Sequence, residues 1–191
     1  MRRSRLTLTL ALVALMTGAN ATEALSQTAP AATADCVAIP VNMIVDRAIA
    51  PMVRRAISEV ETVRRQCGLI ASARHLRVSI RLHPGRLIGG TRAQATITRY
   101  AFGAMRAEIT LPATSRQVEM LAHELEHVIE QLEGTKLQEL AGQQRSGVTR
   151  FADGAFETRR AEQAGRAAER EVWNAIGAAG TAGTRSTTAV R

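Results

Sequence analysis

The segment 115-SRQVEMLAHELEHVIEQLEG-134 combines an apolar pattern of helical period with a cluster of His and Glu residues. Thr114 and Gln117 have the spacing of a capping box at its start, and Gly134 is suited to a helix end. The pattern predicts an amphipathic helix over residues 115–133. The apolar residues that share one face of this helix are Val118, Leu121, Leu125, Val128, Ile129 and Leu132.

The run His123-Glu124-Leu125-Glu126-His127 inside this helix fits the pattern H-E-x-x-H. Two His four residues apart lie on one helix face and can bind the same zinc ion, with the Glu as general base. At about 100° per residue, the His pair lies roughly opposite the apolar stripe. We therefore expect the pair to point away from the sheet, toward whatever covers the other side of the helix. A solvent-exposed polar face is the alternative interpretation.

The segments before this helix predict a further helix and a small sheet. A stripe at helical spacing predicts a helix over residues 46–66 that ends at Gly68, with Cys67 on the core side. The residues of this stripe are Ile49, Val53, Ala56, Val60 and Val63. Alternation of apolar and polar residues predicts strands at 76–82, 93–99 and 105–111, of which the last two form a hairpin.

The segments after the His-containing helix predict a long connection and a last helix. Residues 135–152 are expected to be irregular, with a short turn at 137–141, and residues 155–176 to be helical. The Gly/Thr/Ser-rich residues 177–191 are expected to be a disordered tail. Residues 36–176 thus predict an α+β domain with three main helices and an antiparallel or mixed sheet of about three strands.

The N-terminus has the three-part layout of a secretory signal peptide. Arg2, Arg3 and Arg5 precede an uncharged apolar run over 6–16, and small residues ending in Ala19-Asn20-Ala21 follow it. The run is too short for a stable membrane span. We expect cleavage after Ala21, a flexible segment over 22–35, and a periplasmic or secreted protein without a membrane span. Cleavage near Ser26 and an uncut N-terminal anchor are the alternatives.

Length and composition restrict the class of protein. A chain of 191 residues with 46% hydrophobic and 22% charged residues suits one folded domain and excludes a disordered tail. Aromatic residues make up only 3%, so a base-stacking surface is hard to build. Loss of residues 1–21 removes three Arg and no acid, which lowers the net charge from +8 to +5. No nucleic-acid partner is therefore expected.

Cys36 and Cys67 are the two cysteines of the chain. An even number of cysteines in an exported protein suggests a disulfide, and two buried free thiols are the alternative.

From about Leu76 to Ile176 the chain resembles the zincin metallopeptidases, in which strands precede an H-E-x-x-H helix and a further helix follows. The resemblance implies that His123 and His127 bind Zn²⁺ and that Glu124 activates a water molecule. It also implies that an edge strand at 105–111 holds an extended peptide. A zinc-binding protein without turnover, acting as a binding module, is the alternative.

A catalytic zinc takes three protein ligands, so a third must be found. The metzincin branch requires a Gly at position 130 and a His at position 133, where this chain has Glu130 and Glu133. Glu130 is better placed for a hydrogen bond to His127 than for ligation. The gluzincin branch takes a Glu from a later helix; here the candidates are Glu157, Glu162, Glu169 and Glu171.

Glu157 is the preferred third ligand because it falls on the small-residue face of the last helix. That face comprises Ala161, Ala164, Ala168, Val172 and Ala175. A carboxylate facing a core is costly unless it is paired or metal-bound. A first-turn carboxylate stabilised by the helix dipole is the alternative role. His75 and His83 are expected at the surface, Tyr100 in packing contacts or on the edge-strand surface, and Met120 in the cleft lining or core. The sequence thus predicts an exported zinc peptidase that acts on a peptide or protein substrate.

Overall fold

The computed structural model describes residues 36–83 and 93–184, with side chains up to residue 178. The predicted signal peptide, the whole predicted flexible segment over 22–35 and residues 185–191 lie outside the described residues. The elements are, in chain order, β1 (Met43–Val45), α1 (Ala50–Glu59), α2 (Glu61–Ser72), β2 (Leu76–His83), β3 (Gln94–Arg99), a 3-10 turn (Ala101–Gly103), β4 (Met105–Pro112), α3 (Gln117–Leu132), α4 (Leu137–Ala141), β5 (Val148–Arg150), β6 (Phe156–Thr158) and α5 (Arg159–Thr184).

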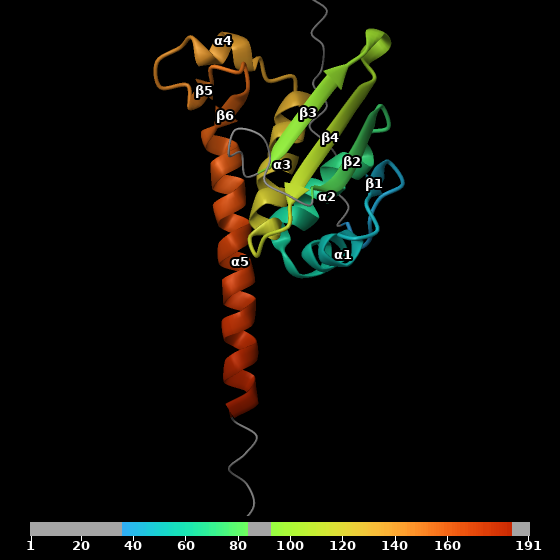
Figure 1. Ribbon diagram of the computed structural model, residues 1–191, viewed down its shortest axis with the longest axis vertical. Coiled ribbons are helices and arrows are strands. Elements are labelled where there is room, and N and C mark those ends of the chain that lie inside the picture. Colours follow the sequence, from blue (N-terminus) through green and yellow to red (C-terminus); the bar gives the residue numbers. More distant parts are fainter. Residues whose placement is uncertain (1–35, 84–92, 185–191) are drawn as a thin grey trace, which may run out of the picture. The chain divides into compact units, whose positions relative to one another are not determined.

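Among the described residues, four strands form a mixed sheet in the order β1-β2-β4-β3. β1 pairs parallel with β2, β2 pairs parallel with β4, and β3 pairs antiparallel with β4 as the predicted hairpin. Helices α1, α2 and α3 pack against one face of this sheet (Figure 1). The mixed α/β content agrees with the predicted class, and the sheet has one strand more than expected.

The prediction that the strand at 105–111 lies at the sheet edge is wrong. β4 lies between β2 and β3, and β3 is the edge strand next to α3. The inward residues of β4 explain this placement because Ala107, Ile109 and Leu111 are all fully buried. β3 instead carries polar residues such as Gln94 and Thr98, which suit an edge. The missed strand β1 is too short for its alternation to be recognised.

The predicted helix over 46–66 is two helices, α1 and α2. Val60 separates them with an extended backbone (φ −113°, ψ 110°), a conformation that β-branched residues favour. Its side chain stays in the core with 2% exposure, so the stripe is buried although the helix is broken. Gly68 does not end α2; it lies buried inside it. The predicted disulfide between Cys36 and Cys67 is confirmed, and Cys67 lies in the core.

Helix α3 follows the predicted helix closely, with one local difference at its start. The Thr114 hydroxyl accepts a hydrogen bond from the Arg116 N–H, and the Gln117 side chain donates to the Pro112 carbonyl. The predicted capping box is therefore absent from the start of α3. Gly134 ends the helix as expected, with a φ of +79° that favours glycine.

Helix α5 begins later and ends later than predicted. Residues 156–158 form strand β6, which pairs with β5 in a second small sheet that the sequence analysis missed. Residues 177–184, expected to be disordered, continue the helix. Helix α5 packs along α3 through Ala161, Ala164 and Ala168, which are buried as predicted (Figure 1). None of the helices within the described residues has the length and apolar character of a membrane span.

Candidate metal centre

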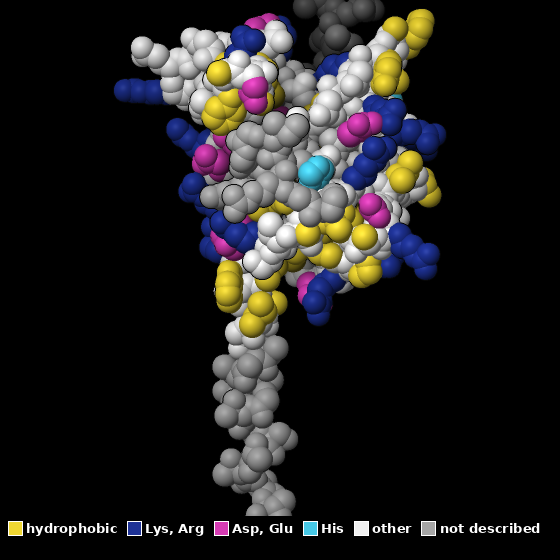
Figure 2. All heavy atoms as spheres, in the orientation of Figure 1, with side chains coloured by type: hydrophobic (Ala, Val, Ile, Leu, Met, Phe, Trp, Pro, Cys, Tyr) yellow, Lys and Arg dark blue, Asp and Glu magenta, His cyan; other side chains and the backbone are white. Residues whose placement is uncertain are grey.

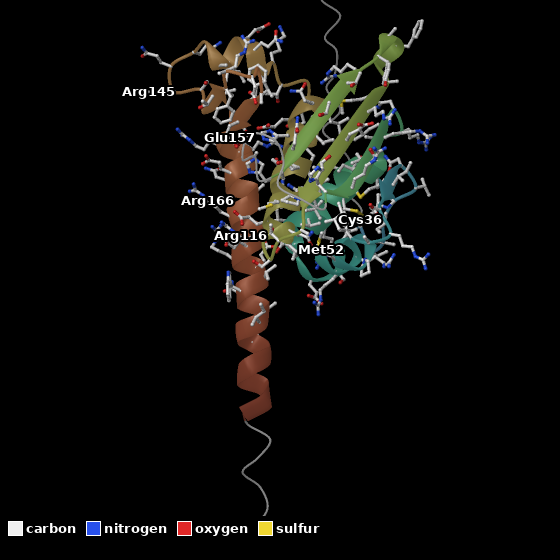
Figure 3. All side chains as sticks on the ribbon, viewed as in Figure 1. Cys36, Met52, Arg116, Arg145, Glu157 and Arg166 are labelled. Atoms are coloured by element: carbon white, nitrogen blue, oxygen red, sulfur yellow. A yellow bond between two sulfur atoms is a disulfide. The ribbon has the colours of Figure 1, made fainter. Side chains whose placement is uncertain are left out.

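His123, His127 and Glu157 form one compact group in which the possible ligand atoms lie within 4.8 Å of one another. Glu157 Oε1 lies 3.3 Å from His123 Nε2 and 3.7 Å from His127 Nε2. Both imidazoles come from α3, whereas Glu157 comes from β6, at the point where the chain enters α5 (Figure 3). One carboxylate oxygen thus faces both imidazole Nε2 atoms, an arrangement that could hold a metal ion.

The β5–β6 sheet and the start of α5 direct Glu157 toward α3. Glu157 pairs with Thr149 of β5, and the following Thr158 accepts the Ala161 N–H at 3.0 Å as the helix cap. Because Thr158 caps α5, the helix begins after Glu157. The interpretation of Glu157 as a first-turn helical residue is therefore wrong, although its carboxylate does face the His pair. The extended backbone of β6, and not a helix face, directs the Glu157 carboxylate toward the His pair.

Glu130 contacts the second nitrogen of His127. Its Oε2 lies 3.1 Å from His127 Nδ1, and the carboxylate is 3% exposed. This is the contact expected of Glu130 from its position on the helix. A partner at Nδ1 fixes the orientation of the imidazole and leaves Nε2 toward Glu157.

Glu124 lies between α3 and the edge strand β3. It is 6% exposed and accepts a hydrogen bond from the backbone of Ala95 in β3. Burial raises the pKa of Glu124 above its ordinary value, against the opposing effects of His123 and His127. Glu124 is thus beside the ligand group and held by the strand that borders it.

The charges of the group favour a cation. Burial lowers the pKa of His123, but the hydrogen bond to Glu157 and the charge of Glu124 outweigh it, so this pKa is raised. Burial likewise raises the pKa of Glu157, and the contact with His123 reverses the effect, so this pKa is lowered. Two carboxylates therefore place negative potential at the two imidazole Nε2 atoms.

The group opens into a cleft of 1690 Å³ between β3, α3, α4 and the β5–β6 segment. His123, Glu124, His127 and Glu157 all line this cleft, and Met120 lines it as expected. The His pair thus faces β6 and α5, away from the apolar stripe, although the edge strand β3 also borders the cleft. On the face shown in Figure 2, Lys and Arg side chains of the described residues are interspersed with Asp and Glu.

The other candidate acids of the last helix have different partners. Glu162 borders the cleft but is exposed and pairs with Arg166 at 3.2 Å. Glu169 lies 3.4 Å from Arg116, and Glu171 accepts the Thr62 hydroxyl at 2.7 Å. His75, His83 and Tyr100 do not occur among the described residues that line the cleft, and Tyr100 is 52% exposed.

A contact between Glu126 and Arg160 was not predicted from the sequence. Glu126 belongs to the HELEH run, yet it is 1% exposed and binds Arg160 and Gln66. In the sequence, Arg160 follows the predicted ligand Glu157 by three residues. This position alone does not indicate a contact with Glu126, because only the fold brings the two residues together.

Comparison of the chain with models of known protein families, with curated proteins and with solved structures finds no match.

Proposed function

We propose that this chain is an exported zinc-dependent peptidase of the zincin class with a gluzincin-like ligand set. One observation carries the proposal: the imidazoles of the H-E-x-x-H run and the Glu157 carboxylate converge at the wall of an open cleft, with Glu124 beside them.

The residues present fit a catalytic zinc. Two imidazole nitrogens and one carboxylate oxygen are a donor set that zinc accepts in catalytic sites, where a fourth position stays open for water or substrate. Imidazole ligands favour transition metals over Ca²⁺ and Mg²⁺, which prefer oxygen donors. The contact of Glu130 with His127 supplies the outer support that such imidazoles usually have. His123, His127 and Glu157 would therefore hold the ion.

Glu124 is the general base of the proposed reaction. A zinc ion bound by His123, His127 and Glu157 would supply Lewis acidity toward the substrate carbonyl and toward water. The Glu124 carboxylate takes a proton from the attacking water and transfers it to the leaving amine. The hydrogen bond from Ala95 holds Glu124 in place while it does so.

The edge strand β3 supports a peptide as the substrate. Ala93 and residues 94–97 of β3 border the cleft. Within the part of the chain that the structure describes, β3 has one neighbour in the sheet, β4. An extended peptide can pair with the open side of such a strand. The role expected of the strand at 105–111 thus passes to β3.

The disulfide supports export. A bond between Cys36 and Cys67 is typical of proteins that fold in an oxidising compartment. It agrees with the signal peptide that the N-terminal sequence predicts.

Zinc content and hydrolysis of an unfolded protein substrate, with and without chelator, test the proposal. We expect Glu124→Gln to retain zinc and to lose hydrolysis by about 10²–10⁴-fold, because the base is removed and the ligands are kept. Glu139→Gln, which removes an exposed carboxylate from the same cleft, is the matched control and should remain active. Zinc binding without hydrolysis in the wild type would refute the peptidase and favour the binding module.

A further inference from the structure

A second charged cluster lies outside the cleft lining and joins α3 to α5. We call it the α3–α5 clamp, and it consists of Glu126, Glu133 and Arg160. Arg160 Nε donates to Glu126 Oε1 at 2.5 Å, Nη1 donates to Glu133, and Nη2 donates to Glu133 Oε1 at 3.1 Å. Arg160 therefore binds Glu126 of α3, the helix that carries both imidazoles, and Glu133, the residue that caps the end of this helix.

Glu126 is a rigid anchor for this clamp. Its carboxylate is almost fully buried, and its second oxygen accepts a hydrogen bond from Gln66 Nε2 of α2 at 2.7 Å. Gln66 itself is fully buried and also donates to the Ala122 carbonyl of α3. Because both oxygens of the buried Glu126 carboxylate accept hydrogen bonds, this carboxylate has little freedom to move together with Arg160.

Most of the remaining α3–α5 contact sets how close the two helices lie but does not fix how they slide. The ion pair between Glu169 of α5 and Arg116, which caps the start of α3, is a second link at the far end of α3. The residues of α5 that face α3 are small: Ala161, Ala164, Gly165 and Ala168. Small side chains form shallow ridges, so this surface of α5 offers little resistance to sliding along the axis of α3. Glu133, the residue that caps the end of α3, follows Glu126 by two turns, so their joint contact with Arg160 fixes the axial position of the start of α5.

This axial position determines where Glu157 lies. Arg160 follows Glu157 by three residues, and the capping residue Thr158 makes that connection stiff. At the other end of the clamp, Glu126 directly precedes His127. We propose that Arg160 and Glu126 are a positioning pair that holds the Glu157 carboxylate over the two imidazoles. This inference rests on the proposed metal centre and adds the device that assembles it.

The test compares the metal affinity of full-length variants. Arg160→Met removes the clamp, and Arg160→Lys keeps the charge but loses the forked contact with two carboxylates. The double variant Glu126→Gln/Arg160→Met also removes the buried Glu126 charge, which in the single variant keeps only the longer ion pair with Arg65 at 3.7 Å. Glu171→Gln is the control, because it loosens α5 from Thr62 of α2 far from the site.

Zn²⁺ affinity is measured by competition with a chromophoric chelator, and the ligand set by the visible spectrum of the Co²⁺-loaded protein. Thermal unfolding of each metal-free variant is measured separately. We expect Arg160→Met to lose at least about tenfold in Zn²⁺ affinity and to change the Co²⁺ spectrum. Arg160→Lys should fall between Arg160→Met and the wild type.

The control and the double variant separate positioning from stability. Glu171→Gln should unfold at a lower temperature and bind Zn²⁺ like the wild type. The double variant should regain thermal stability relative to Arg160→Met without regaining affinity. Wild-type affinity in Arg160→Met, or an equal loss in Glu171→Gln, would overturn the inference alone. A wild-type protein that binds neither ion would overturn the metal centre and the inference together.

Discussion

Gly165 of α5 lies where this helix crosses α3 beside His123. A Cβ atom at this position would lie 3.2 Å from the Glu119 carbonyl oxygen and 3.4 Å from His123 Cβ. The substitution Gly165→Ala therefore tests whether the candidate site requires this close approach of the two helices.

Two opposing effects determine the stability of Gly165→Ala. Alanine is favoured over glycine inside a helix by about 1 kcal/mol. Overpacking of a close contact costs about 1–3 kcal/mol. The atom in the way is a backbone carbonyl of a buried helix, which cannot rotate aside, so the second effect prevails. We expect the free energy of unfolding to fall by about 1 kcal/mol, which lowers the urea midpoint by roughly 0.5 M.

Gly177→Ala on the same helix is the matched control, because a Cβ there meets no atom of the described residues within 4 Å. The helix preference favours alanine at that position without an overpacking cost, so the free energy of unfolding should rise by up to about 1 kcal/mol. Gly165→Ala should in addition weaken Zn²⁺ binding by about tenfold, since α5 moves away from His123. A Gly165→Ala variant that is as stable as Gly177→Ala and binds Zn²⁺ like the wild type would refute this reasoning.

Two further predictions concern the third ligand and the disulfide. Glu157→Ala should lose zinc during dialysis against a weak chelator, because two imidazoles hold the ion poorly, whereas Glu162→Ala should retain it; the opposite result would exclude Glu157 as the ligand. Replacement of Cys36 and Cys67 by Ser, which opens a loop of sequence separation 31, should lower the free energy of unfolding by about 3–4 kcal/mol in urea titrations. Two titratable thiols in the denatured, unreduced wild type would contradict the disulfide.

Local patterns in the sequence were sufficient to predict several elements. The apolar stripe of α3 and the four-residue spacing of His123 and His127 depend only on the helical period, so both were predictable. The same holds for β2 and for the β3–β4 hairpin, whose alternation is local. The short turn expected at 137–141 coincides with the short helix α4, and the two cysteines offered only one pairing.

The order of the strands and the break at Val60 could not be predicted in this way. Strand order depends on pairing between distant segments, and neither strand of a pair contains information about its position in the sheet. β4 therefore appeared as an edge strand although two neighbours enclose it. Val60 fitted the helical stripe equally well, and only packing of α1 and α2 on the sheet shows that the helix is interrupted.

The same distinction between local sequence pattern and tertiary packing applies to the residues of the candidate site. The sequence alone determined that His123, Glu124 and His127 lie close together, because residues 123–127 lie on consecutive turns of one helix and their geometry follows from its period. Only the tertiary structure decided the contacts with residues from other parts of the chain. It places Glu157 on a strand instead of a helix, the Ala95 backbone against Glu124, and Arg160 against the buried Glu126. A distance of 3.3 Å between groups 34 positions apart in sequence, as for His123 and Glu157, arises only when β6, α5 and α3 pack together.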